Sequence, residues 1–212
     1  MARSPSRSLT LSEGLLAELH TEMRMCRRCL GAGFSITPGA VFSGPASARF
    51  LIVGQAPGAS EAENGRPFNG SSGQRLFGWL AEAGWDEGVF RATQYITAIT
   101  KCYPGKSSGG KGDRAPTREE QALCAPFLRR ELDLVQPRVV VPVGSLAVRR
   151  FLGSSRLSDV VGTVINEPDG RSIVPLPHPS GVSLWLNRSE NQERVHQALA
   201  HLRRLHYQLE PG

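Results

Sequence analysis

The feature that most constrains the fold of this chain is residues 50–70, which read FLIVGQAPGASEAENGRPFNG. The apolar run 50–53 is typical of a buried strand, and it leads directly into a loop rich in glycine and proline. Glycine lets the main chain approach a ligand closely, and loops at the carboxyl ends of strands are where open α/β sheets bind ligands. The segment therefore predicts an α/β protein with a binding site on this loop.

Further apolar, β-branched runs alternate with helical patterns along the chain. We expect strands at 50–53, 95–100, 139–143 and 172–175, and helices at 12–25, 73–83, 117–135, 145–152 and 189–209. Continuous apolar strands separated by helices indicate a parallel sheet that helices cover on both faces. The expected fold class is therefore α/β, a three-layer α/β/α sandwich with a central, mainly parallel four-stranded sheet. The 212 residues suit a single domain over 1–212, of which we expect 1–11 to be flexible.

The chain has four cysteines, and their pattern indicates a metal site. Cys26 and Cys29 form a CxxC pair, and Cys102 and Cys124 follow much later. The N-terminal residues lack the apolar core of a signal peptide, so we expect a reducing compartment in which disulfides are disfavoured. Zinc and a [4Fe–4S] cluster both accept four thiolates, and the residue types alone leave that choice open.

The charge of the chain favours an acidic partner such as nucleic acid. The formal net charge is +6 and the pI is about 9.6. All three lysines, Lys101, Lys106 and Lys111, lie in or beside residues 104–114, a glycine- and serine-rich stretch that predicts a mobile loop. This loop is either a solvated linker or a flap that contacts phosphates. No apolar run approaches the roughly 20 residues that cross a membrane.

A second loop of interest follows the last expected strand. Residues 175–187 read PLPHPSGVSLWLN, and His178 is the titratable residue in them. A lone histidine in a loop is usually a surface residue. Here it comes after a strand, so we expect it at the same edge of the sheet as the glycine-rich loop.

Together these motifs resemble the uracil-DNA glycosylase superfamily, and they lie closest to its iron–sulfur branches. The first loop is similar to the family 4 pattern G-E-x-P-G-x-x-E-D…G-R-P-F-x-G and the family 5 pattern G-L-A-P-G…G-R-P-F-T-G, and His178-Pro-Ser180 is similar to the second motif. Both families place an N-terminal CxxC, a third cysteine after a strand and a fourth early in the next helix. The resemblance therefore implies a [4Fe–4S] cluster, with zinc as the alternative, on the four cysteines.

The resemblance also implies an activity and its site. Such an enzyme flips a nucleotide out of DNA and hydrolyses the N-glycosidic bond of uracil to start base-excision repair. Phe68 is expected to stack on the flipped base, and His178 to donate a hydrogen bond to uracil O2 as negative charge develops there. The backbone around Gly54, Gln55 and Ala56 is expected to bind the carbonyl edge of the base.

The chain departs from its relatives at the acid of the first motif. Family 4 has Glu where this chain has Gln55, and the family 1 motif G-Q-D-P-Y-H has Asp where it has Ala56. Glu61 falls on the family 4 pattern and is the expected base or electrostatic stabiliser, with Glu63 and Asn64 in reserve.

A second departure concerns which bases are accepted. Family 4 reads the uracil edge with an Asn in the strand before the third cysteine, whereas this chain has Ala98, as family 5 does. Family 5 accepts a wider set of damaged bases, and a site without that amide discriminates less. We therefore expect DNA containing uracil or another deaminated base as the partner, with Asn69 as a replacement amide.

The loop after His178 is expected to enter the DNA minor groove. Val182 occupies the wedge position of the family, and minor-groove enzymes insert such apolar residues between base steps. The expected DNA-binding residues are Ser180, Val182, Ser183, Leu184 and Trp185. Leu184 and Trp185 alternatively begin a core helix.

Three readings of function follow. The first is a monofunctional glycosylase, since neither motif holds a lysine for Schiff-base chemistry. The second is a catalytically weak or inactive uracil- or damaged-DNA-binding protein of the same fold, favoured by the missing carboxylate. A third, an unrelated zinc hydrolase, would leave the paired motifs coincidental. Covalent trapping of DNA is not expected, because residues 69–75 lack a histidine. A monomer in the bacterial or archaeal cytosol or nucleoid is expected.

Overall fold

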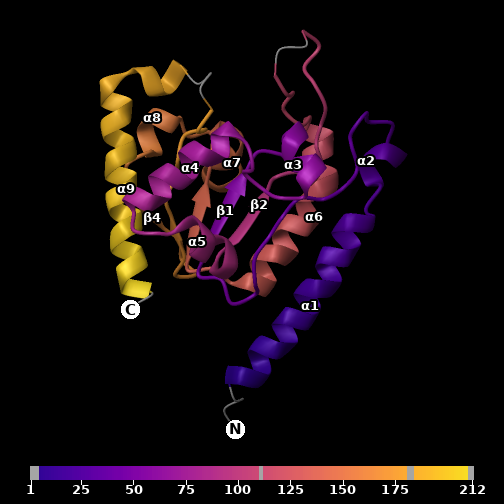
Figure 1. The fold of residues 1–212 in the computed structure, drawn as a ribbon, viewed down its shortest axis with the longest axis horizontal. Coiled ribbons are helices and arrows are strands. Elements are labelled where there is room, and N and C mark those ends of the chain that lie inside the picture. The colour runs from indigo at the N-terminus through magenta and orange to yellow at the C-terminus, as the bar shows by residue number, and fades with distance from the viewer. Residues whose placement is uncertain (1–4, 110–111, 181–183, 210–212) are drawn as a thin grey trace.

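A five-stranded, mainly parallel sheet forms the centre of the computed structural model, which describes residues 5–109, 112–180 and 184–209, the first six of these by backbone alone (Figure 1). The strands are β1 (Phe50–Gly54), β2 (Tyr95–Ala98), β3 (Val139–Pro142), β4 (Ile165–Asn166) and β5 (Ser172–Ile173). Their order is β2-β1-β3-β5-β4, and only β4 runs antiparallel to its neighbour. The mainly parallel α/β class is confirmed.

The prediction of four strands was one too few. The missed strand, β4, has two residues and lies at the edge of the sheet, where it pairs with β5. Two residues carry no periodic pattern, so the sequence gives no signal for such a strand.

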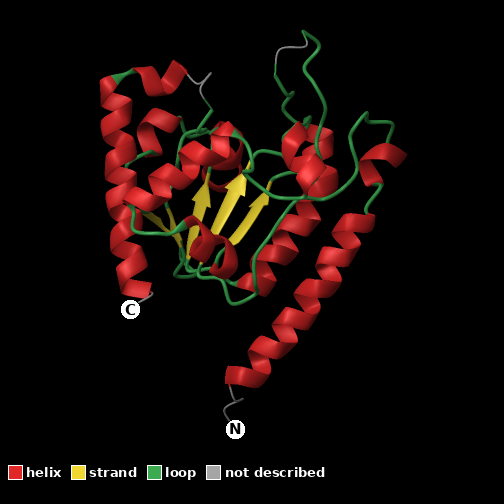
Figure 2. Ribbon diagram, viewed as in Figure 1, coloured by secondary structure: helices red, strands yellow, loops and turns green. Residues whose placement is uncertain are grey.

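Helices cover both faces of the sheet (Figure 2). The helices are α1 (Pro5–Met25), α2 (Arg28–Gly31), α3 (Ala59–Asn64), α4 (Ser71–Glu82), α5 (Glu87–Thr93), α6 (Arg118–Val135), α7 (Ser145–Leu152), α8 (Leu157–Val160) and α9 (Ser189–Leu209), with a 3₁₀ helix η1 (Leu184–Asn187). Helix α1 begins at Pro5, earlier than predicted. The flexibility of 1–11 and the single-domain organisation stay predictions.

Alternate residues of β1 show how the layers are built. Phe50 and Ile52 pack on one face, in a cluster with residues of α4, α5 and α9, whereas Leu51 and Val53 pack on the other, with residues of α1, α6 and α7. Since successive side chains of a strand point to opposite faces, both faces of this sheet are apolar. This arrangement is the expected three-layer sandwich. In the part of the chain that the structure describes, no helix is long and apolar enough to cross a membrane.

The carboxyl ends of the central strands meet at one edge of the sheet. The parallel pairings of β1 with β2 and with β3 set Gly54 beside Ala98, and Val53 beside Pro142. The loops that leave β1, β2 and β3 therefore emerge side by side, which the arrowheads in Figure 2 make visible.

Candidate active site and cysteine centre

A cleft of about 730 Å³ lies at the carboxyl ends of β1 and β2. This volume is within the range of small-molecule sites. Both sequence motifs line it, together with the end of β2 and the loop before α6; its residues include Gly54, Gln55, Ala56, Glu61, Phe68, Ala98, Asp113, His178 and Ser180. The structure therefore brings together two segments that are far apart in the sequence.

The half-buried Phe68 is held in an unusual backbone conformation in this cleft. Its φ is 52°, in the left-handed region that non-glycine residues rarely adopt. Its carbonyl accepts a hydrogen bond from Arg91 Nη2 at 3.0 Å. A Cβ added to Gly54 would lie 3.1 Å from the Phe68 ring, and one added to Gly73 would lie 1.8 Å from the Phe68 carbonyl oxygen. Strained residues of this kind persist only where their surroundings fix them, and here two glycines give the required space.

Glu61 also holds the loop that carries Phe68. Its Oε2 accepts the backbone N–H of Gly58 at 2.5 Å, its Oε1 accepts that of Phe68, and Asn69 N–H also binds the carboxylate. Burial raises the pKa of Glu61, while these backbone hydrogen bonds oppose the rise. The reserve Glu63 is exposed and does not line the cleft.

The side-chain amides of Asn64 and Asn69 do not line the cleft. Asn64 donates to the Ser60 carbonyl at 2.7 Å, and the exposed Asn69 is likewise absent from the cleft lining. Gln55 and Ala56 line the cleft and are half-buried. The carbonyl of Gln55 accepts the N–H of Thr100 at 3.3 Å, which attaches the first motif to the chain beyond β2.

A backbone hydrogen bond and burial together favour one neutral tautomer of His178. Its Nδ1 accepts the backbone N–H of Ser180 at 3.2 Å, and burial lowers its pKa, which favours the neutral ring. In a neutral imidazole whose Nδ1 accepts, Nε2 carries the proton. Gly144, with φ +87°, packs against the ring: a Cβ there would lie 3.3 Å from His178 Cβ and Cδ2.

The loop after His178 is described in part. Ser180 lines the cleft, and its carbonyl accepts a hydrogen bond from Arg75 Nη1 at 3.3 Å. Val182 and Ser183 lie outside the described residues. Leu184 and Trp185 begin η1; Leu184 is 79% exposed, whereas Trp185 is partly buried against the core.

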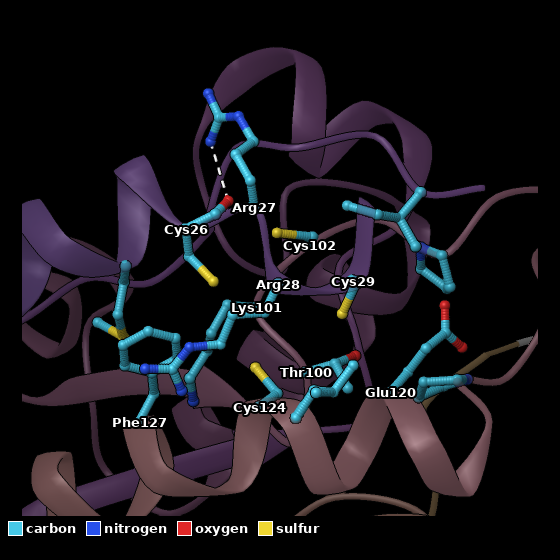
Figure 3. A pocket seen from close by; sticks show the side chains of 15 residues that line it. Cys26, Arg27, Arg28, Cys29, Thr100, Lys101, Cys102, Glu120, Cys124 and Phe127 are labelled. Carbon is cyan, nitrogen blue, oxygen red and sulfur yellow. Dashed lines mark hydrogen bonds between the residues drawn. The ribbon is translucent and has the colours of Figure 1, made fainter. Parts of the chain in front are cut away.

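The four cysteines line one cavity beside α6 (Figure 3). Cys26 follows α1, Cys29 lies in α2, Cys102 follows β2 and Cys124 lies in α6. Their sulfur atoms face a common space in Figure 3. Burial raises the pKa of Cys102 to about 11, and it also raises the pKa of Cys29 and Cys124; the repulsion between neighbouring thiolates adds to each rise.

The four cysteines form a donor set for a metal centre. Within the described residues, no three His, Cys, Asp or Glu side chains are placed to hold a single metal ion. The cavity that the cysteines share is also lined by apolar side chains, among them Met23, Ile36, Leu123 and Phe127. Four cysteine thiolates are a donor set that both zinc and an iron–sulfur cluster accept.

A sequence profile of the uracil DNA glycosylase superfamily matches residues 41–203 of this chain. The chain belongs to the uracil DNA glycosylase superfamily. It is 32% identical to the type-4 uracil-DNA glycosylase of Thermotoga maritima, over 86% of this chain and 90% of the relative. It is 36% identical to the type-5 uracil-DNA glycosylase of Pyrobaculum aerophilum, over 68% of this chain and 67% of the relative. The resemblance to both iron–sulfur branches of the superfamily is thereby confirmed.

This superfamily member contains two features near its site that the sequence did not reveal. The first is the burial of Lys101, a residue that the sequence places beside the lysine-containing loop 104–114. Its side chain is 2% exposed, and its Nζ lies 2.6 Å from Glu131 Oε2, a carboxylate that is fully buried. Lys101 also donates to the carbonyl of Ala98 at 2.6 Å, and Ala98 lines the cleft.

The second feature is Asp113, which lines the cleft although it belongs to residues 104–114. The two ends of this loop are paired: Lys106 and Asp113 form a β-bridge, and Arg114 N–H donates to the Gly105 carbonyl at 3.0 Å. Asp113 therefore has a defined position against the cleft. A glycine-rich linker pattern gives no signal for such a placement.

Proposed function

We propose that this protein is a monofunctional uracil-DNA glycosylase, a hydrolase that cleaves the N-glycosidic bond of uracil in DNA and so starts base-excision repair. The observation that carries the proposal is that Phe68 and His178 line one cleft. Membership of the superfamily and identity to type-4 and type-5 uracil-DNA glycosylases support it.

The proposed chemistry assigns different tasks to these two residues. A glycosylase acts on a base that has left the duplex, and the ring of Phe68 offers it a stacking surface. As the glycosidic bond lengthens, uracil takes up negative charge at O2. The Nε2–H of His178 donates to this atom, and a donor fixed in advance stabilises the transition state more than the ground state. The backbone of Gly54, Gln55 and Ala56 binds the carbonyl edge of the base.

Glu61 is proposed as the electrostatic stabiliser of the sugar cation. Its hydrogen bonds with three backbone N–H groups support a second task, because they hold the loop that carries Phe68. Its charge would lie in the same cleft as the oxocarbenium-like sugar.

The proposed substrate is DNA that contains uracil or another deaminated base. Ala98 lines the cleft and offers no amide to the Watson–Crick edge, which favours a wider base range. Ser180, Val182, Ser183, Leu184 and Trp185 are proposed to contact the DNA strand, with the exposed Leu184 beside the wedge. Asn69 stays a candidate for reading the base, although it is absent from the cleft lining.

Cys26, Cys29, Cys102 and Cys124 are proposed to hold a [4Fe–4S] cluster, with zinc as the alternative. When bound, such a group contributes folding free energy and no catalytic step. It would join α1, α2 and α6 to the segment after β2. A monomer in the cytosol or nucleoid of a bacterium or archaeon completes the proposal.

The test is strand scission after base release. Purified protein is incubated with labelled single- and double-stranded oligonucleotides that contain one uracil, and abasic sites are then cleaved with alkali. Scission above the no-enzyme control supports the proposal. Absence of scission by protein with an intact brown cluster would overturn the uracil assignment.

A second candidate function is a binding protein without turnover, favoured by the neutral residues Gln55 and Ala56 at the acid positions. A panel containing hypoxanthine, xanthine and 5-hydroxymethyluracil separates the two. Release of one of these bases indicates altered specificity, whereas tight binding without release indicates the binding protein.

A further inference from the structure

The two peptide groups on either side of the Phe68 Cα are each held at both their N–H and their carbonyl. Glu61 accepts the N–H groups of Phe68 and Asn69. The guanidinium of Arg91 donates to the two carbonyls, from Nη1 to Pro67 at 2.8 Å and from Nη2 to Phe68 at 3.0 Å. Since the relative orientation of these two planar groups defines φ and ψ of Phe68, Glu61 and Arg91 together fix its backbone.

Arg91 is itself held by two helices. It lies in α5 next to the buried Phe90, and its Nε donates to Glu87 Oε1 at 2.8 Å. Its guanidinium carbon lies 4.1 Å from the centroid of the buried Phe77 ring of α4, which is a cation–π contact. All three guanidinium nitrogens therefore donate to protein atoms, and the group that grips the Phe68 loop has a defined position of its own.

The position of the Phe68 ring depends on this backbone. Its φ of 52° is a conformation that a residue with a side chain adopts only where its surroundings impose it. If the two carbonyls were released, the flanking peptide groups would turn towards a more ordinary conformation, and the ring would move with the Cα. In the structure the ring lies against Gly54 at the end of β1, where an added Cβ would be 3.1 Å from it. Contacts behind the loop therefore set where the ring stands in the cleft.

We propose that Arg91 is a positioning residue for the base: by holding the carbonyls on both sides of Phe68, it places the Phe68 ring where an extrahelical base stacks. This inference rests on the proposed glycosylase function, in which Phe68 touches the base. Arg91 is absent from the lining of the cleft. Its effect on the reaction is therefore exerted through Phe68.

The alternative role for an arginine near this cleft is a direct contact with a DNA phosphate. Arginines that bind phosphate offer free N–H groups at the protein surface. The side chain of Arg91 is 12% exposed, and three of its N–H groups already donate within the protein. Its geometry therefore favours the positioning role, and the two roles differ in the salt dependence that they predict for DNA binding.

The test is a double-mutant cycle on the single-turnover rate of uracil release. Arg91→Ala, Phe68→Ala and the double variant are compared with wild type and with Arg129→Ala, a matched control at an exposed position of α6. We expect Phe68→Ala to lower the rate about 30-fold, as loss of base stacking does, and Arg91→Ala to lower it about 10-fold. In the Phe68→Ala background, Arg91→Ala should cost less than about twofold, because the two residues act as one unit.

Guanidinium ion separates positioning from a general loss of structure. Arg91→Ala leaves a gap beside two carbonyls, Glu87 and the Phe77 ring, which are the groups that held the original guanidinium. Millimolar guanidinium chloride should therefore restore part of the rate to Arg91→Ala and none to the double variant, relative to sodium chloride of equal ionic strength. Arg91→Lys keeps a cation but lacks the planar fork that reaches both carbonyls, so it should remain slow. If Arg91→Ala gave no folded protein, Arg91→Lys would take its place in the cycle.

Binding of the same DNA without uracil is measured against salt concentration. Loss of a phosphate contact lowers the slope of log affinity against log salt by about one, whereas loss of a positioning residue leaves it unchanged. We expect Arg91→Ala to keep the wild-type slope. A slope lower by about one would overturn the inference and make Arg91 a phosphate contact.

The two proposals fail in distinguishable ways. If the wild-type protein releases uracil and the rate of Arg91→Ala lies within about twofold of it, the glycosylase function stands and the role of Arg91 falls. Equal losses from Arg91→Ala in the wild-type and Phe68→Ala backgrounds would also overturn that role, since Arg91 would then act independently of Phe68. If wild-type protein with an intact brown cluster releases none, both proposals fall.

Discussion

The cleft and the cysteine centre begin only a few residues apart, yet they are built by opposite means. Ala98, at the end of β2, lines the cleft, and Cys102, soon after it, lines the cysteine cavity. The cleft is formed largely by backbone: a left-handed Phe68, glycines that make room for rings and carbonyls, and N–H groups that bind Glu61. The cysteine centre is formed by side chains from four separate segments.

The two regions should therefore differ in the substitutions that they tolerate. A site made by backbone geometry depends less on the identity of its side chains, and here positions 55 and 56 carry the uncharged residues Gln and Ala. A centre made by four thiolates depends on every one of them, because a bound cluster would contribute to the folding free energy itself. Substitutions in the cysteine centre should therefore act on stability, and substitutions in the cleft should act on rate.

The largest expected effect comes from Cys124→Ser. Metal binding can supply about 10 kcal/mol of folding free energy, which is comparable to the whole stability of an ordinary domain. We expect the variant to lose the brown colour and to fail to give folded protein. The measurement is the visible absorption spectrum together with circular dichroism. A folded, colourless variant that released uracil would contradict a structural role for the centre.

The next effect is expected at Lys101, between the two regions. Lys101→Met leaves the carboxylate of Glu131 buried without its cation, and breaking a buried pair costs about 3–5 kcal/mol. Lys106→Met is the matched control, since Lys106 is exposed and should leave the unfolding midpoint in denaturant unchanged. If both variants unfolded at the same denaturant concentration, the Lys101–Glu131 ion pair would contribute nothing to stability.

His178→Ala should lower the rate and leave the stability unchanged, which is the opposite of the two preceding substitutions. Loss of one hydrogen-bond donor to a developing anion lowers kcat by about 10²- to 10³-fold. The fold should be unaffected, and the melting temperature should match that of His196→Ala, a change at an exposed position on α9. Uracil release and thermal unfolding, measured on both variants, check this. Equal rates in the two variants would remove His178 from the chemistry.

The sequence predicted features that local patterns encode. The cysteines, the apolar strands and the two motif loops were recognised because each has its signal within a few neighbouring residues. The β4 strand was missed because two residues form no pattern. The burial of Lys101 was missed because it depends on Glu131, which lies in α6.

The position of Asp113 was missed for a related reason. Its loop has the composition of a linker, and only the contacts with Tyr103 and the start of α3 place its carboxylate in the cleft. The strained backbone of Phe68 was also not evident, because a φ of 52° is imposed by Glu61, Arg91 and Gly73 together. Tertiary contacts, and not local propensity, decide such positions.

The smallest expected effect is on the pH dependence of stability. It arises on the face of the sheet that α1 covers. His20 on α1 contacts the Tyr95 hydroxyl at 2.8 Å, and that hydroxyl donates to Glu131. Burial, with a smaller contribution from Arg24, lowers the pKa of His20 to about 4. The unfolded chain therefore binds a proton at His20 more readily than the folded chain does. Stability from the neutral ring is complete above the unfolded pKa of about 6.5 and is lost as pH falls towards about 4.

Since His20 is partly exposed, we expect solvent screening to limit this loss to about 1–2 kcal/mol. His20→Gln should flatten the decline of unfolding free energy between pH 6.5 and pH 4, measured by urea titration at each pH. His201→Gln, on α9 and remote from Tyr95 in the sequence, is the control and should keep the wild-type slope. If the slope of unfolding free energy against pH were unchanged in His20→Gln, other groups would cause the acid sensitivity. The contacts of His20 with Tyr95, and of Tyr95 with Glu131, would then be uncoupled from the titration of His20.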